Sequence, residues 1–197
     1  GAILADCPWT FETYSAKGKG RSAENHYPCM TDAEIAKLPV KELAADDCVL
    51  FLWTTGAKLE DALWTIQEWG FDYKTMGFVW VKEGKAGGWR KGMGFWTRSN
   101  PEFCLLGTRG SPRRLDYDVE ELIGAPVREH SRKPDEARKR IGRLVAGPYL
   151  ELFARSRAEG WDAWGSEVGK FAEEPTHEPA GAAVKVSKKV ARAMMKE

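Results

Sequence analysis

The run Cys48-Val-Leu-Phe-Leu-Trp53 is apolar at every position, which is typical of a strand that is covered on both of its faces. A second apolar run, Ala2-Ile-Leu-Ala5, ends where Asp6 begins a polar turn. Further strands are expected over residues 75–81, 102–108, 149–154 and 161–164, with an extended segment over 127–130. Because helices are expected between these strands, the alternation predicts an α/β fold with a mostly parallel sheet.

Two helices of the first half of the chain can be located from their sequence patterns. Thr31 and Glu34 have the spacing of a capping box, which predicts a short helix that runs to about Leu38. A longer helix is expected over residues 57–69, before Gly70. The apolar residues along one face of this helix are Leu59, Ala62, Leu63, Ile66 and Trp69.

A third helix is expected to begin at Pro134 and to run to about Val145. Asp135 and Glu136 then lie in its first turn, where the helix dipole favours negative charge. The basic residues expected on its exposed face are Arg138, Lys139, Arg140 and Arg143.

Length and composition indicate one globular domain with a charged tail. Of the 197 residues, 43% are hydrophobic and 30% are charged, and we expect a folded domain over residues 1–171 and a tail or linker over 172–197. Residues 183–196 of this tail fit either a basic amphipathic helix or a solvated segment. No apolar run approaches the roughly 18 residues of a membrane span, so no membrane association is expected.

Cysteine usage and net charge narrow the classes of function. The four Cys residues contain no Cys-x-x-Cys pair and no zinc-finger spacing, which predicts reduced thiols in a cytoplasmic protein and no metal site. The formal net charge is only +1, so the overall charge carries no signature of a strong nucleic-acid binder.

The tetrapeptide Asp6-Cys7-Pro8-Trp9 is the candidate reacting centre, because α/β sheets bind ligands at the carboxyl ends of their strands. The Asp6 carboxylate and the Cys7 carbonyl can together hold the N–H groups of an exocyclic amine and free its lone pair for attack. Pro8 restricts the turn, and Trp9 offers a flat face for a base. Methyl transfer to such an amine depends mainly on in-line positioning and needs no metal. The alternative is a simple strand-end turn in which Asp6 is a local cap.

Several further motifs follow this tetrapeptide in order. They are FLWTT at 51–55, EFCLLGTRG at 102–110, REHSRKPDE at 128–136, LELFAR at 150–155 and GWDAWGSE at 160–167. Together with DCPW at 6–9, this set resembles the MT-A70 family of adenine-N6 methyltransferases, whose signature is Asp-Pro-Pro-Trp, over about residues 2–167. The resemblance implies a Rossmann-like class I methyltransferase fold with helices on both faces of the sheet. It also implies a permuted order, in which the catalytic strand precedes the cofactor-binding strand, and S-adenosylmethionine as cofactor.

The resemblance also implies roles for individual residues. Asp6 matches the catalytic Asp, which lies near the methionine part of the cofactor, and Lys133 matches the Lys near the cofactor carboxylate. The remaining positions matched to cofactor binding are Glu151, Arg155, Ser166 and Glu167. Lys, Arg and hydroxyl groups suit a zwitterionic amino acid and a ribose diol.

Two positions depart from the family pattern. Cys7 stands where the family has Pro, and its carbonyl can serve in the same way with a less rigid turn. Ser166 stands where the family has Asn, and its shorter reach puts the strength of cofactor binding in question.

Two loops are candidates for contact with the substrate, because the corresponding loops of the family border the substrate entrance. The candidate residues in these loops are Lys17, Lys19 and Arg21 in the first, and Trp89, Arg90, Trp96 and Arg98 in the second. Basic residues suit contact with phosphates, and the indoles suit stacking on bases. The alternative is a pair of solvated loops whose Trp residues pack inward. His130, beside Lys133, fits either the cofactor pocket or a turn cap.

The sequence therefore favours an S-adenosylmethionine-dependent methyltransferase of compact bacterial or phage type that modifies N6 of adenine in DNA. One alternative is an RNA adenine-N6 methyltransferase with the same centre, and another is a catalytically silent, nucleic-acid-binding subunit of the same fold. Nucleic acid is the expected partner, with DNA favoured over RNA, and a homodimer or a heterodimer is compatible with the sequence. A nicotinamide dehydrogenase is disfavoured, since no G-x-G-x-x-G opens a helix after a strand.

Overall fold

The strand that carries the candidate reacting centre, β1 (Ala2–Ala5), lies inside a seven-stranded sheet. It pairs in parallel with β2 (Cys48–Thr54) on one side and with β6 (Tyr149–Leu152) on the other. The computed structural model describes residues 1–11, 29–84, 87–128 and 132–171. Lys17, Lys19, Arg21, His130 and the expected tail at 172–197 lie outside the described residues.

The other strands extend the sheet on both sides of β1. They are β3 (Asp72–Glu83), β4 (Glu102–Arg109), β5 (Leu122–Pro126) and β7 (Trp161–Trp164), and the strand order is β5-β3-β4-β2-β1-β6-β7. β4 is antiparallel to both of its neighbours, whereas every other neighbouring pair is parallel. The mostly parallel Rossmann-like sheet is thus confirmed, and a single reversed strand is the feature that the sequence did not predict.

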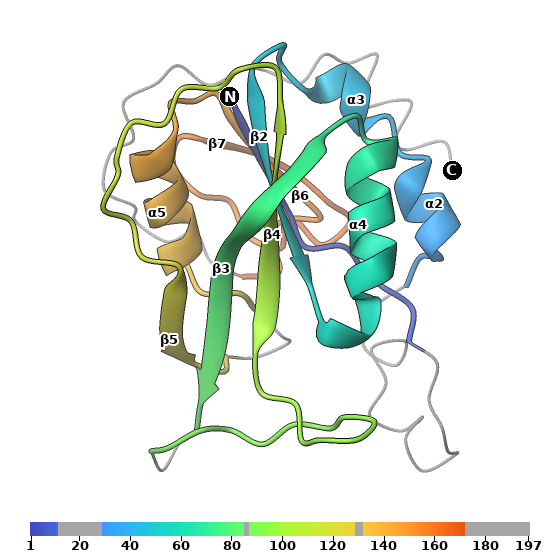
Figure 1. Ribbon diagram of the computed structural model, residues 1–197, viewed down its shortest axis with the longest axis vertical. Coiled ribbons are helices and arrows are strands. Elements are labelled where there is room, and N and C mark those ends of the chain that lie inside the picture. Colours follow the sequence, from blue (N-terminus) through green and yellow to red (C-terminus); the bar gives the residue numbers. More distant parts are fainter. Residues whose placement is uncertain (12–28, 85–86, 129–131, 172–197) are drawn as a thin grey trace.

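Helices cover both faces of this sheet, as predicted (Figure 1). One face carries α2 (Asp32–Ala36), α3 (Val40–Leu43) and α4 (Leu59–Glu68), which follows the 3₁₀ turn η2 (Gly56–Lys58), and the other carries α5 (Glu136–Leu144). The predicted capping box of α2 is present, since the Thr31 hydroxyl accepts from the Glu34 backbone N–H and the Glu34 carboxylate accepts from the Thr31 N–H.

Alternate residues of β2 enter two separate hydrophobic cores. Leu50 and Leu52 pack in one core with Ile66 of α4, and Phe51 and Trp53 pack in the other, which contains Ile141 of α5. This burial on both faces is the physical reason why the run from Cys48 to Trp53 is apolar at every position.

Two local expectations differ from the structure. The extended segment expected over 127–130 lies earlier, as β5, because Ile123 is buried against the sheet and β5 pairs in parallel with β3. Leu59 was expected on the buried face of its helix but is exposed, since it is the first residue of α4 and lies next to η2. None of the helices in the described residues has the length and apolar character that a membrane span requires.

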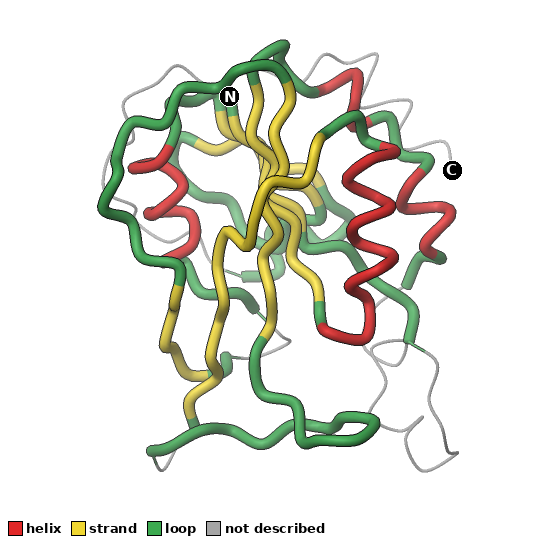
Figure 2. The backbone as a smooth tube through the Cα atoms, viewed as in Figure 1, coloured by secondary structure: helices red, strands yellow, loops and turns green. Residues whose placement is uncertain are grey.

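The topology places the ends of all parallel strands at one edge of the sheet. In Figure 2 the loop that joins β3 to β4, over residues 84–101, extends beyond this edge and contains no helix. Because β1, β2, β3 and β6 all end there, residues from distant parts of the sequence meet around Asp6.

Candidate active site

The position of Asp6 follows from the register of β1 and β6. Ala5 lies opposite Leu152 and Leu4 opposite Glu151, so the segment after β6 emerges beside Asp6. The segment that leads into α5 approaches the same edge from the other face of the sheet (Figure 1). The predicted residues Asp6, Lys133, Glu151 and Arg155 therefore all line one pocket.

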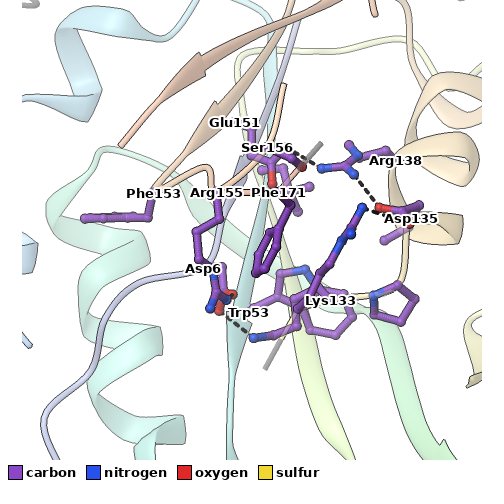
Figure 3. A pocket seen from close by; sticks show the side chains of 14 residues that line it. Asp6, Trp53, Lys133, Asp135, Arg138, Glu151, Phe153, Arg155, Ser156 and Phe171 are labelled. Carbon is purple, nitrogen blue, oxygen red and sulfur yellow. Dashed lines mark hydrogen bonds and ion pairs between the residues drawn. The ribbon is translucent and has the colours of Figure 1, made fainter. Parts of the chain in front are cut away.

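Two cations hold the Asp6 carboxylate. The Lys133 Nζ donates to Oδ1 at 2.7 Å, and the Arg155 Nη2 donates to Oδ2 at 2.9 Å. Figure 3 shows the three side chains converging on one point. Each of these side chains is less than one fifth exposed, so the ion pairs are screened only weakly by solvent.

Glu102 and Lys82 extend this ion-pair network. Lys133 also contacts Glu102 at 3.1 Å, and Glu102 contacts Lys82 at 2.5 Å. Burial opposes ionisation of Glu102, but the charges of Lys133 and Lys82 outweigh it and hold its pKa below the usual value. Burial likewise opposes the charge of Lys133, but Asp6 and Glu102 outweigh it and hold its pKa well above the usual value. The network is therefore fully charged at neutral pH.

The sequence analysis did not identify Lys82 and Glu102 as site residues. Glu102 is a carboxylate at the first position of an otherwise apolar strand, and it is only 7% exposed. A buried charge of this kind requires a partner, which is the signal that would have identified it.

A second charged cluster holds Glu151. Arg138 Nη1 donates to Glu151 Oε2 at 2.8 Å, and Arg138 also contacts Asp135, which pairs in turn with Arg128. Burial raises the pKa of Glu151 more than the charge of Arg138 lowers it. The expectation that Arg138 lies on an exposed helix face is wrong, because the first turn of α5 faces the sheet edge and leaves Arg138 only 8% exposed.

Asp6 lies at the junction of two pockets. The first contains Lys133, Glu151 and Arg138, and the second contains Cys7, Pro8, Ser166 and Glu167. The residues that border both pockets are Asp6, Phe153 and Arg155. The arrangement can therefore hold one ligand in each pocket, with Asp6 between them.

The backbone is strained at this junction. Phe153 has a φ of 58°, the left-handed region that a bulky side chain rarely adopts, and its ring packs edge-on against Trp164 at 5.4 Å. A Cβ at Gly165 would lie 2.6 Å from the Ala154 carbonyl oxygen, so only glycine permits this close approach. The sequence analysis did not identify Phe153 as a site residue either.

The tetrapeptide is fixed by backbone contacts. The Cys7 carbonyl accepts from the Trp9 N–H, and the Pro8 carbonyl accepts from the Met30 N–H, both at 2.9 Å. A carbonyl oxygen has two lone pairs, so Cys7 can accept a second hydrogen bond. The Cys7 thiol is buried, and burial, aided by the charge of Asp6, raises its pKa well above the usual value, which keeps the thiol neutral.

Trp9 differs from the expectation of a flat face open to a base. Its indole is only 4% exposed, packs in the hydrophobic core and donates from Nε1 to the Trp53 carbonyl at 3.2 Å. It does not line either pocket beside Asp6. The side chain at this position therefore anchors the tetrapeptide to β2.

The predicted substrate residues of the second loop lie at the surface. Trp89 is 68% exposed and Trp96 is fully exposed, and Arg90 and Arg98 are exposed beside them. These indoles do not pack inward. The separate residues Ser166 and Glu167 line the second pocket, where Glu167 also pairs with Lys170.

Known proteins can now be compared with this geometry. The profile of the MT-A70 family matches residues 1–167. The chain belongs to the MT-A70 family. This confirms the predicted family and fold, and with them the class of enzyme, an adenine-N6 methyltransferase that depends on S-adenosylmethionine.

Individual relatives of this MT-A70 chain differ in length. The chain is 34% identical over 185 residues to the Type II methyltransferase M.MunI of Mycoplasma sp, an alignment that covers 84% of this chain and 76% of that protein. It is 33% identical over 157 residues to the human N(6)-adenosine-methyltransferase catalytic subunit METTL3, covering 78% of this chain and 25% of that protein. An MT-A70-like N(6)-adenosine-methyltransferase of Arabidopsis thaliana is 34% identical over 176 residues, covering 85% of this chain and 24% of that protein.

Proposed function

We propose that this MT-A70 chain transfers the methyl group of S-adenosylmethionine to N6 of adenine in DNA, with Asp6 as the catalytic residue. The observation that carries the proposal is the position of the Asp6 carboxylate, which lies between two pockets and is held by Lys133 and Arg155. A carboxylate so placed can contact the cofactor on one side and the amine that receives the methyl group on the other.

The charges of the first pocket fit the cofactor. Its amino-acid part is a zwitterion, and the ammonium groups and guanidinium groups of Lys133 and Arg155 suit a carboxylate, whereas Asp6 suits an ammonium group. Glu151 keeps Oε1 available for a ribose hydroxyl while Oε2 accepts from Arg138. When bound, the cofactor supplies an electrophilic methyl carbon that an amine can attack.

The tetrapeptide then orients the amine. One Asp6 oxygen accepts one N–H of the adenine amine, and the second lone pair of the Cys7 carbonyl accepts the other. Two acceptors at these positions draw the nitrogen toward tetrahedral geometry, which localises its lone pair. After the transfer, the proton that the nitrogen must lose passes to the Asp6 carboxylate.

Asp6 becomes free for the amine when its cations find other partners. Lys133 retains Glu102 as a partner at 3.1 Å, so it can release Asp6 and bind a ligand carboxylate without becoming an unpaired buried charge. Glu102 thus has a structural reason to be charged and buried in this protein.

The choice of DNA over RNA is supported by the comparison of lengths. Type II methyltransferases act on DNA, and the chain spans 76% of M.MunI, compared with 24–25% of the N(6)-adenosine-methyltransferases. RNA is the second candidate, because those adenosine methyltransferases are similarly identical to the chain over the part that they share.

A direct test uses cofactor with a labelled methyl group and two oligonucleotides of the same sequence, one DNA and one RNA. After incubation and digestion to nucleosides, label in N6-methyldeoxyadenosine supports the proposal. Label in N6-methyladenosine alone replaces DNA by RNA. The matched variants are Asp6→Asn, which should abolish transfer, and Asp72→Asn, an exposed carboxylate on β3 that should leave the rate unchanged.

The silent-subunit alternative is distinguished by binding. Titration calorimetry should detect S-adenosylmethionine binding to the wild-type protein and weaker binding to Lys133→Met. Absence of cofactor binding in the wild type, together with retained binding of nucleic acid, would favour the silent subunit. The cytoplasmic location and the dimeric state stay predictions.

A further inference from the structure

The loop between β3 and β4 presents large apolar side chains to solvent. Residues 87–100, which we call the aromatic arm, follow the carboxyl end of β3 and lie beyond the sheet edge where Asp6 is found (Figures 1 and 2). The exposed apolar residues of the arm are Trp89 (68%), Met93 (54%), Phe95 (65%) and Trp96 (100%). Such a concentration on one segment indicates a binding surface.

The charge of the arm has a single sign. Arg90, Lys91 and Arg98 lie between these apolar residues, and residues 87–100 contain no Asp or Glu. The protein as a whole has a formal net charge of only +1, so this segment is a local concentration of positive charge. Cationic groups that alternate with exposed aromatic rings are the combination that binds the backbone and the bases of a single strand.

The base of the arm is tied to the active site. The Asn100 side chain donates to the carbonyls of Lys82 and Arg90 at 2.8 and 2.5 Å, and the Arg90 N–H donates to the Lys82 carbonyl at 2.8 Å. The Lys82 ammonium begins the ion-pair chain that continues through Glu102 and Lys133 to Asp6. The arm is therefore anchored to a residue that is only a few side chains from the reacting carboxylate.

We propose that the aromatic arm binds the strand that carries the target adenine by stacking Trp96 on an unpaired neighbouring base, so that the protein prefers single-stranded or locally opened nucleic acid. This inference rests on the proposed function for the identity of the target base. The bases of an intact duplex cover one another's faces, so an exposed indole can stack only on a base that has left the stack. Arg90, Lys91 and Arg98 then contact the phosphates of the same strand.

A second copy of this chain is a poorer occupant of the arm. If two arms met across a two-fold axis, each would present the same basic residues to the other and no acidic residue of the arm would compensate them. A polyanion neutralises all of these charges at once.

The test measures binding in the absence of any methyl acceptor. Fluorescence anisotropy with a labelled oligothymidylate, which contains no adenine, separates arm binding from N6 chemistry. We expect the wild-type protein to bind this single strand at least about 5-fold more tightly than a duplex of the same length. Trp96→Ala should weaken single-strand binding about 10-fold, since stacking on one base is lost, and Trp96→Phe should retain part of the affinity.

The matched control is Trp64→Ala, which removes an indole that is 42% exposed on α4. It should change single-strand binding less than 2-fold, and thermal unfolding should show that both alanine variants remain folded. Equal binding of single strand and duplex, or unchanged binding by Trp96→Ala, would overturn the inference. So would conversion of a dimer to a monomer by Trp96→Ala in sedimentation velocity. Normal oligothymidylate binding without any transfer to adenine would count against the proposed function alone.

Discussion

Lys133 is the residue whose removal should reveal most about the active site. Its Nζ lies 2.7 Å from Asp6 and 3.1 Å from Glu102, and the Lys133 side chain is only 15% exposed. Lys133→Met keeps the length and the apolar stem of the side chain but deletes the charge. Asp6 then retains Arg155, and Glu102 retains Lys82.

The magnitude follows from these contacts. Deletion of one partner of a buried ion pair costs about 3–5 kcal/mol when the remaining charge has no other partner. Here each carboxylate keeps one cation, and the variant also relieves the repulsion between Lys133 and Arg155. We therefore expect the free energy of unfolding to fall by about 2–3 kcal/mol at pH 7. For a protein of this size, that loss lowers Tm by about 5–10 °C.

The loss should also depend on pH. Lys133 helps to hold the pKa of Glu102 below its ordinary value of 4.5, so this contribution to stability is present above pH 4.5 and is lost as the pH falls through the lowered pKa. The difference in stability between wild type and Lys133→Met should therefore shrink below about pH 4.5. Urea unfolding at several pH values measures this difference.

A double-mutant cycle isolates the pair. Glu102→Gln combined with Lys133→Met should cost less than the sum of the two single changes, since each single change already removes the shared contact. Lys74→Met is the control, because this half-exposed Lys makes only a 3.9 Å surface contact with Asp72 and should leave the midpoint unchanged. A loss below about 1 kcal/mol for Lys133→Met at pH 7 would refute the reasoning, as would strict additivity in the cycle.

Three further predictions concern catalysis and cofactor binding. Asp6→Asn keeps the shape of the side chain but removes its charge, and the rate of labelled methyl transfer should fall at least about 100-fold; a rate near that of the wild type would exclude Asp6 from the mechanism. Arg138→Met leaves Glu151 without its 2.8 Å partner, which should weaken cofactor binding about 10-fold in calorimetry, whereas an unchanged Kd would limit Arg138 to a structural role. Because burial raises the pKa of Glu151 and the ionised form is the better acceptor, cofactor affinity should rise with pH through that raised pKa in the wild type and stay flat in Glu151→Gln; the same slope in both proteins would contradict this assignment.

The sequence alone was sufficient to predict the elements that depend on local pattern. Continuous apolar runs predicted β1 and β2 as strands that are buried on both faces, and Thr31 with Glu34 predicted the cap of α2. Burial periodicity and capping are properties of a few neighbouring residues, so they leave a direct trace in the sequence. The order of the motifs was likewise enough to identify the MT-A70 family and its fold.

The directions and partners of these elements were decided by the tertiary structure. The apolar run of β4 looks the same whether the strand is parallel or antiparallel, and its reversal follows only from its pairing with β2 and β3. Trp9 and Arg138 were misplaced for a related reason. An indole can pack inward or face a pocket, and an Arg on a helix can find a buried carboxylate, depending on what lies across from it.

The sequence by itself determined which residues could serve as acid, base and cation, and at which ends of which elements they lie. Only the folded chain decided that Lys133 and Arg155 would meet Asp6, across separations of 127 and 149 positions. Contact at such a distance depends on the register of β1 with β6 and on the approach of the segment before α5 to the same sheet edge. These are relations between elements, and no short stretch of sequence contains them.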